Sequence, residues 1–257
     1  MIVFYFTATG NSLSVARHIA ASSEGARVVN ITEALAEPAA QWHDDVVGIV
    51  TPTHTGDMPT PVARFFETAD IRAEYLFVVF TCGVTPGIAS RKVRSRARHR
   101  GLQVNYINSI KMVDNNFALY NVRRQIETVG AKNVPAHQAA IAADIAARRT
   151  RIAPLTALDW FLGICMEALP AQKKFYRHYH VDTARCTGCG ICAKVCPVDA
   201  VVNTADGTPQ WNDKCIRCTA CYHNCPHQAI SHDSVKGGYC QYRNSEVTLA
   251  DLTKTSK

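Results

Sequence analysis

The first 110 residues alternate short apolar runs with segments of helical periodicity. Residues 2–6 form an apolar run of β-branched and aromatic side chains, and residues 11–22 follow with apolar positions at helical spacing. Nearly continuous apolar strands separated by helices are typical of a parallel sheet covered on both faces. The pattern predicts a doubly wound α/β domain over residues 1–150, which binds ligands beyond the carboxyl ends of its strands. Further strand-like runs occupy residues 27–31, 45–50, 75–80 and 102–110.

The sequence predicts that residues 151–178 form a connecting helical segment between this domain and the remainder of the chain. Pro154, Asp159 and Glu167 interrupt its apolar stretch, which makes it too broken for a membrane span. A buried or interfacial helix is expected instead. The side chains that we expect in its core include Trp160, Phe161 and Cys165.

Residues 179–257 contain eight of the eleven cysteines, arranged as C-x2-C-x2-C-x3-C-P written twice. Three closely spaced thiolates can wrap one iron–sulfur cluster, and in two-cluster ferredoxins the fourth cysteine ligates the other cluster. The repeat therefore predicts crossed ligation in a small α+β domain. One [4Fe-4S] cluster takes Cys186, Cys189, Cys192 and Cys225, and the other takes Cys215, Cys218, Cys221 and Cys196.

Other uses of these cysteines fit the spacing less well. Structural zinc sites pair Cys-x2-4-Cys units and close with four ligands, whereas each run here has three close cysteines and a fourth before proline. Disulfides are disfavoured because the first residues show neither a basic region nor a cleavage site of a secretory signal. We therefore expect a cytoplasmic protein.

The formal net charge of +7 lies almost entirely in residues 1–178, and its densest basic run is residues 91–100. This run is either a solvated helix face or a docking patch that steers an acidic partner. Nucleic acid is disfavoured as a partner, since no aromatic residues interleave with the basic ones and no known binding module is present.

Three loops follow the carboxyl ends of the predicted strands. Residues 7–12 come directly after the first strand and open a helix, where hydroxyls, backbone N–H groups and the helix dipole favour a phosphate. This loop lacks both the Gly-x-Gly-x-x-Gly fingerprint and the lysine of a Walker loop. The other two loops are residues 51–59 and 81–87.

Thr-x-Thr-Gly-Asn-Ser after the first strand resembles the phosphate loop of flavodoxins, which bind flavin mononucleotide (FMN). The second and third loops lie where that family flanks the isoalloxazine ring. Joined to the two-cluster half, the chain resembles the flavodoxin–ferredoxin fusion family, found mainly in anaerobic microbes. The resemblance implies a phosphate site at Thr7, Thr9, Gly10, Asn11 and Ser12, and ring contacts from Thr53, His54, Thr55, Cys82 and Gly83.

The combination predicts an electron-transfer flavoprotein in which two [4Fe-4S] clusters and FMN exchange electrons with a redox partner, such as an acidic ferredoxin or a reductase. No Ser-His-Asp set or carboxylate pair stands out, so the pattern does not decide whether the protein is an enzyme. Two alternatives stay open. One is a flavin-dependent reductase of a small molecule fed by the clusters, and the other is a redox sensor or assembly subunit.

Overall fold

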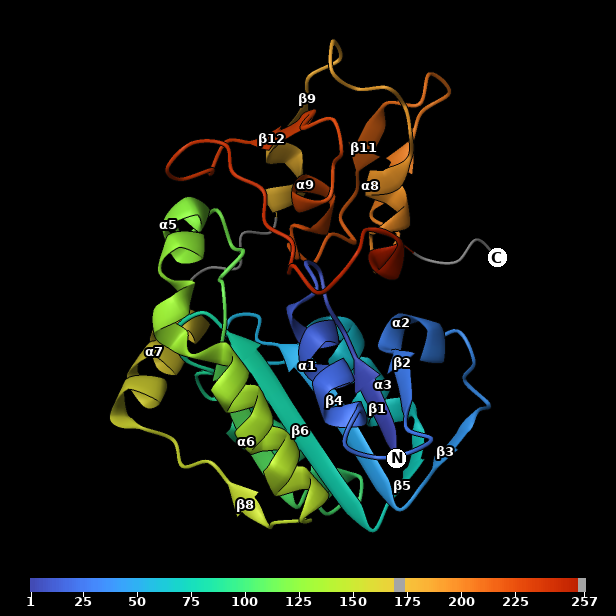
Figure 1. Cartoon of the computed structure of the whole chain (residues 1–257). Coiled ribbons are helices and arrows are strands. Elements are labelled where there is room, and N and C mark those ends of the chain that lie inside the picture. Colours follow the sequence, from blue (N-terminus) through green and yellow to red (C-terminus); the bar gives the residue numbers. More distant parts are fainter. Residues whose placement is uncertain (169–173, 254–257) are drawn as a thin grey trace. The chain divides into compact units, whose positions relative to one another are not determined.

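The structure, a computed structural model, describes residues 1–168 and 174–253 (Figure 1). The chain divides into two compact units. The first unit comprises Met1–Thr7, Asn11–Met112 and Gly130–Pro170, and the second comprises Ala8–Gly10, Val113–Val129 and Ala171–Lys257. Residues 113–129, which the sequence pattern assigned to the first domain, thus group with the second unit. The predicted segments 151–178 and 179–257 extend over residues 169–173 and 254–257, which lie outside the described residues.

A parallel six-stranded sheet forms the centre of the first unit, in the order β2-β1-β4-β6-β7-β8. The residues of β1 and β6 are all buried, which explains why these strands read as unbroken apolar runs. The strand order reverses between β1 and β4, as in doubly wound flavodoxin-like sheets, and confirms the predicted fold. The strands are β1 (Ile2–Tyr5), β2 (Arg27–Asn30), β4 (Val46–Pro52), β6 (Tyr75–Cys82), β7 (Tyr106–Lys111) and β8 (Arg151–Ile152).

Helices cover both faces of this sheet. Helices α1 (Asn11–Ala20) and α6 (Val134–Ala146) pack together on one face (Figure 1). On the other face Phe4 of β1 meets Phe65 of α3, with ring centroids 4.6 Å apart. The remaining elements of the first unit are α2 (Ile31–Ala34), α3 (Thr60–Thr68), α4 (Ala89–His99), α7 (Ala157–Ala168) and the parallel pair β3 (Gln41–His43) and β5 (Asp70–Arg72).

The second unit is a small α+β fold with two antiparallel strand pairs. One pair joins β9 to β12, the other joins β10 to β11, and the short helices α8 and α9 pack on each other. Phe117, Tyr222 and Ile230 are fully buried in its core. Its elements are α5 (Val122–Glu127), η2 (Phe175–His178), β9 (Tyr179–Val181), α8 (Ile191–Lys194), β10 (Val201–Asn203), β11 (Pro209–Trp211), α9 (Ala220–His223), β12 (Ile230–His232) and η3 (Ala250–Leu252), while η1 (Val129–Lys132) spans the boundary.

Within residues 1–168 and 174–253, no helix combines the length and the apolar character needed to cross a bilayer.

Candidate functional site

Two cysteine-lined cavities lie in the second unit. The first is lined by Cys186, Cys189 and Cys192 of the first run together with Cys225 of the second run. The second is lined by Cys215, Cys218 and Cys221 together with Cys196. Each cavity thus gathers three cysteines of one run and the fourth cysteine of the other. This is the grouping that crossed ligation requires.

The two cysteine runs share one backbone conformation. Left-handed residues flank the middle cysteine in both copies: Gly188 and Gly190 (φ 66° and 71°) correspond to Arg217 and Thr219 (both φ 61°). The same correspondence holds for backbone donors after the fourth cysteine. The N–H of Ala200 donates to Cys196 Sγ at 3.2 Å, and that of Ala229 donates to Cys225 Sγ at 3.3 Å. The repeat in sequence is therefore a repeat in structure.

The cysteine environments suit a polynuclear iron–sulfur centre. Burial raises the pKa of the Cys192 thiol to about 11 and that of Cys221 to about 12, so a thiolate at either position requires a bound cation. Each cavity is lined by four cysteines, the number of ligands that one cubane takes.

The predicted phosphate loop, residues 7–12, connects β1 to α1. Gly10 has φ +98°, a conformation that side chains disfavour. Ser12 is buried, and its hydroxyl shares a 2.9 Å hydrogen bond with the hydroxyl of Thr81 at the end of β6. Thr9 groups with the second unit, where its Oγ1 accepts from Asn115 Nδ2 at 3.2 Å. Because a hydroxyl can accept and donate at once, Thr9 retains its own O–H as a donor.

The second predicted loop is a tight turn. The backbones of His54 and Asp57 exchange two hydrogen bonds of 2.8 and 3.0 Å. Thr55 and Gly56 between them both have positive φ, 49° and 75°, as in a type I′ turn. Thr53 ties this turn to the next strand, since its N–H donates to Thr81 O at 3.2 Å. The loop is thereby held against the carboxyl end of β6.

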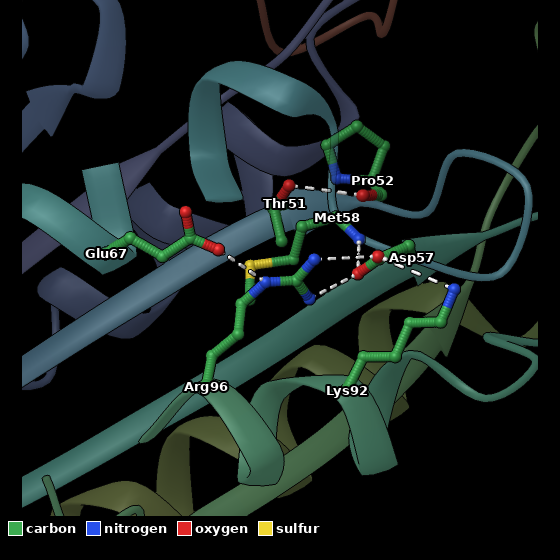
Figure 2. Close-up of polar contacts among 7 residues, drawn as sticks. All are labelled: Thr51, Pro52, Asp57, Met58, Glu67, Lys92 and Arg96. Atoms are coloured by element: carbon green, nitrogen blue, oxygen red, sulfur yellow. Dashed lines mark hydrogen bonds and ion pairs between the residues drawn. The ribbon is translucent and has the colours of Figure 1, made fainter. Parts of the chain in front are cut away.

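Asp57 fastens this turn to α4 (Figure 2). The Arg96 guanidinium donates to both Asp57 carboxylate oxygens, at 2.8 and 2.9 Å, and to Glu67 at 3.0 Å. Lys92 Nζ lies 3.6 Å from the same Asp57 carboxylate, and the Met58 N–H donates to it at 2.7 Å. The hydrogen bonds from Arg96 to Asp57 raise the pKa of the guanidinium, so Arg96 stays charged. Within the basic run, Arg96 is therefore a structural residue.

The third predicted loop is anchored by a lysine that the sequence pattern did not single out. Lys132 Nζ donates to the carbonyl of Gly83 at 2.9 Å and to that of Met112 at 2.5 Å. Cys82 is buried, with Sγ 3.8 Å from Ile110 O. A lysine far along the chain from its partners carries no local signal in the sequence.

Helix α7 packs on the second and third predicted loops. A Cβ on Gly87 of the third loop would lie 3.2 Å from Gly56 Cα and 3.8 Å from Gly163 Cα of α7. A Cβ on Gly163 would lie only 2.6 Å from Ile88 Cγ2. The Thr85 hydroxyl donates to the carboxylate of Asp159, in the first turn of α7. Three segments far apart in sequence meet here because glycines permit the approach.

The orientation of α7 corrects the expected core of the connecting segment. Trp160 is 40% exposed and Phe161 is 65% exposed, and Cys165 is also exposed. Asp159 and Gly163 face the loops instead. The expectation was wrong because the packed face of this helix is set by a small residue and a hydrogen-bonding carboxylate.

Comparison with known protein families matches both units. The sequence model of the flavodoxin domain matches residues 2–115, and that of the 4Fe-4S binding domain matches residues 179–202 and 210–231.

Similar solved structures each cover between 42% and 55% of this chain. An archaeal flavodoxin is 16% identical, with 55% of this chain and 97% of that chain covered at a TM-score of 0.34. The two-electron reduced flavodoxin of Megasphaera elsdenii is 18% identical, with coverages of 51% and 99% and a TM-score of 0.32. A flavoprotein from Lactobacillus acidophilus NCFM in complex with FMN is 14% identical, with coverages of 42% and 91% and a TM-score of 0.32. From its two family matches, the chain is a flavodoxin–ferredoxin fusion.

Proposed function

We propose that this chain carries electrons between two [4Fe-4S] clusters bound by the second unit and an FMN bound through the flavodoxin domain. A redox role follows from the joint presence of a flavodoxin domain and a 4Fe-4S binding domain. The observation that carries the proposal further is the gathering of four cysteines around each of two cavities. A chain with one cluster would need only one such set.

The ligands that we assign follow the cavities. Cys186, Cys189, Cys192 and Cys225 hold one cluster, and Cys215, Cys218, Cys221 and Cys196 hold the other. When bound, the clusters supply one-electron transfer and the flavin exchanges one or two electrons. The N–H groups of Ala200 and Ala229 donate to thiolate sulfurs and lower the cost of their negative charge.

The residues of the three predicted loops bind FMN and orient it. Hydroxyls and backbone N–H groups of residues 7–12 receive the FMN phosphate at the N-terminus of α1. Thr53, His54 and Thr55 of the second loop, with Cys82 and Gly83 of the third, line the ring. The Asp57–Arg96 pair, Lys132 and α7 hold these loops in a fixed conformation, which reduces the ordering that binding requires.

Cofactor content and kinetics test the proposal together. Anaerobically purified protein is expected to contain about eight irons and eight sulfides per chain, the sum for two cubanes. Chromatography of heat-released cofactor is expected to give one FMN. After rapid mixing with a reductant, electron transfer between clusters and flavin is expected to proceed at a rate independent of protein concentration, as an intramolecular step does.

A mixture of two variants provides the control. One chain carries Cys189→Ala and Cys218→Ala to remove both clusters, and the other is wild-type protein stripped of flavin. Exchange in this mixture must be second-order in protein. A wild-type rate that also scales with concentration, or release of FAD or no flavin, would contradict the proposal.

A further inference from the structure

Trp211 places a side-chain N–H on one of the cysteines of the second cavity. Its Nε1 donates to Cys221 Sγ at 3.4 Å, and both residues line that cavity. The indole stacks on the Tyr179 ring with centroids 4.8 Å apart and planes inclined by 14°. Tyr179 is 7% exposed and Trp211 is half-buried, and their stacking fixes the orientation of the donor.

The first cavity has no equivalent donor. The loop before each run starts alike: the Cys186 N–H donates to Asp182 O at 2.9 Å, and the Cys215 N–H donates to Asn212 O at 3.2 Å. The residue that precedes Asp182 is Val181, where the other copy has Trp211. In residues 1–168 and 174–253, no side chain donates a hydrogen bond to the cysteines of the first cavity, which are Cys186, Cys189, Cys192 and Cys225.

The backbone donors to the fourth cysteine of each run, in contrast, are matched between the two copies. Ala200 and Ala229 give each fourth cysteine an N–H at 3.2 and 3.3 Å. Since these donors are equivalent, they cannot distinguish the two sites. The indole of Trp211 does distinguish them, and the Tyr179 hydroxyl also interacts with Cys221.

We propose that Trp211 is a potential-setting residue that raises the reduction potential of the cluster in the second cavity and leaves the other cluster unaffected. This inference rests on the proposed cluster ligation. One-electron reduction adds one negative charge, part of which resides on the thiolate sulfurs. An N–H donor stabilises that charge more in the reduced form than in the oxidised form, and hydrogen bonds to sulfur are among the factors that set these potentials.

Trp211→Phe tests the proposal because it keeps an aromatic ring on Tyr179 and removes the N–H. Both clusters of the holoprotein are titrated anaerobically against a set of mediators, with electron paramagnetic resonance as the readout. The equilibrium constant for reducing one cluster is expected to fall about tenfold, a shift of about 59 mV for a one-electron couple. The other cluster is the internal reference. Trp160→Phe, which removes an indole from α7, is the matched control.

The outcomes separate this inference from the proposed ligation. If the wild-type protein contains iron for only one cluster or for none, the proposed function is contradicted. Two clusters in Trp211→Phe with both potentials unchanged, or both shifted equally, overturn the inference alone. If Trp211→Phe loses its cluster, wild-type protein with 15N-labelled indoles decides. A hyperfine coupling from an indole nitrogen to one reduced cluster supports the inference, and absence of that coupling overturns it.

Discussion

Arg96 of α4 holds Asp57 of the second predicted loop, residues 51–59, through two hydrogen bonds of 2.8 and 2.9 Å, although 39 residues separate them in sequence. Both side chains are mostly covered, with exposed fractions of 23% and 21%. A bidentate guanidinium–carboxylate pair fixes both position and orientation. The turn that carries His54 and Thr55 is therefore positioned by a helix rather than by its own sequence.

Arg96→Gln is expected to lower the free energy of unfolding of the flavodoxin domain by about 1–2 kcal/mol, since it removes charge-assisted hydrogen bonds from a partly buried carboxylate. FMN affinity is expected to fall with it. Anaerobic urea unfolding and flavin titration measure the two effects. Arg94→Gln, an exposed neighbour on the same helix, is the control and is expected to stay within about 0.5 kcal/mol of wild type. Equal effects of both substitutions would show that the pair contributes no stability.

Gly163→Ala is expected to destabilise the first unit by about 1–2 kcal/mol, because the added methyl meets Ile88 at 2.6 Å. Alanine's preference for helix, about 1 kcal/mol over glycine, opposes this cost and limits it. Thermal unfolding and FMN affinity report the change. In Gly130→Ala the added methyl meets open space, so that variant is expected to match wild type. A Gly163→Ala protein as stable as Gly130→Ala would mean that α7 does not pack closely on the loops.

The features that could be predicted from the sequence are those determined by residues close together in the chain. Strands β1 and β6 are apolar, apart from Thr81 near the end of β6, because both of their faces are buried. The cysteine runs are predictable because one spacing, written twice, imposes one backbone conformation twice. Both signals lie within a few residues, so no knowledge of packing is needed to recognise them.

The features that the sequence hid depend on contacts between distant segments. Arg96 is one basic residue among many in residues 91–100, and only the placement of α4 beside the loop gives it Asp57 as a partner. Lys132 reaches Gly83 in the same way. In α7 the packed face is marked by Gly163, which has no side chain to signal burial, while apolar Phe161 faces outward.

Crossed ligation is tested by comparing single cysteine variants. Cys225→Ala is expected to lose the same cluster as Cys189→Ala, because both cysteines line the first cavity. Cys196→Ala is expected to lose the same cluster as Cys218→Ala, which lines the second. Each variant should retain about four irons, the content of one cubane. Iron analysis and the paramagnetic signature of the remaining cluster provide the comparison. Loss in Cys225→Ala of the cluster that Cys218→Ala loses would rule out the crossed assignment.

The buried imidazole of His232 is expected to make the protein less stable in mild acid. It is 4% exposed, its Nε2 lies 3.0 Å from Phe175 O, and its Nδ1 accepts from the Ser234 N–H at 3.0 Å. These partners assign the proton to Nε2, and protonation of Nδ1 breaks the second bond. Burial lowers the pKa of His232 below 6.5, although the hydrogen bond to Phe175 raises it. The neighbouring charges oppose one another: Asp233 raises this pKa, and His178 and His180 lower it.

The direction in which stability changes with pH follows from proton uptake by the imidazole. Below about pH 6.5 the unfolded imidazole binds a proton that the folded one does not, so the free energy of unfolding falls as pH falls towards the folded pKa. Anaerobic urea unfolding between about pH 7.5 and 5.5 measures this slope. His232→Gln is expected to be less stable at the upper pH but to have a shallower slope, whereas His137→Gln, at an exposed site, should keep the wild-type slope. A slope unchanged in His232→Gln would assign the acid sensitivity elsewhere.

Two exposed arginines of the basic run, Arg94 and Arg98 of α4, form the candidate docking patch. Arg91 beside it lies 5.2 Å over the Trp160 ring, so basic and partly exposed aromatic side chains adjoin. Steering by such charges accelerates encounter with an acidic partner and weakens as salt screens it over about 10 Å at 0.1 M.

Replacing Arg94 and Arg98 together by Gln is therefore expected to slow electron exchange with an acidic two-cluster ferredoxin several-fold at low salt. Most of the salt dependence should disappear, and the unfolding free energy should stay near wild type because neither side chain is buried. Stopped-flow mixing at a series of ionic strengths measures the rate. Arg72→Gln removes one exposed positive charge from β5 and serves as the control for loss of charge away from α4. If the double variant and Arg72→Gln exchange electrons at the wild-type rate at every salt concentration, residues 91–100 form only a solvated helix face, and the partner docks on another surface.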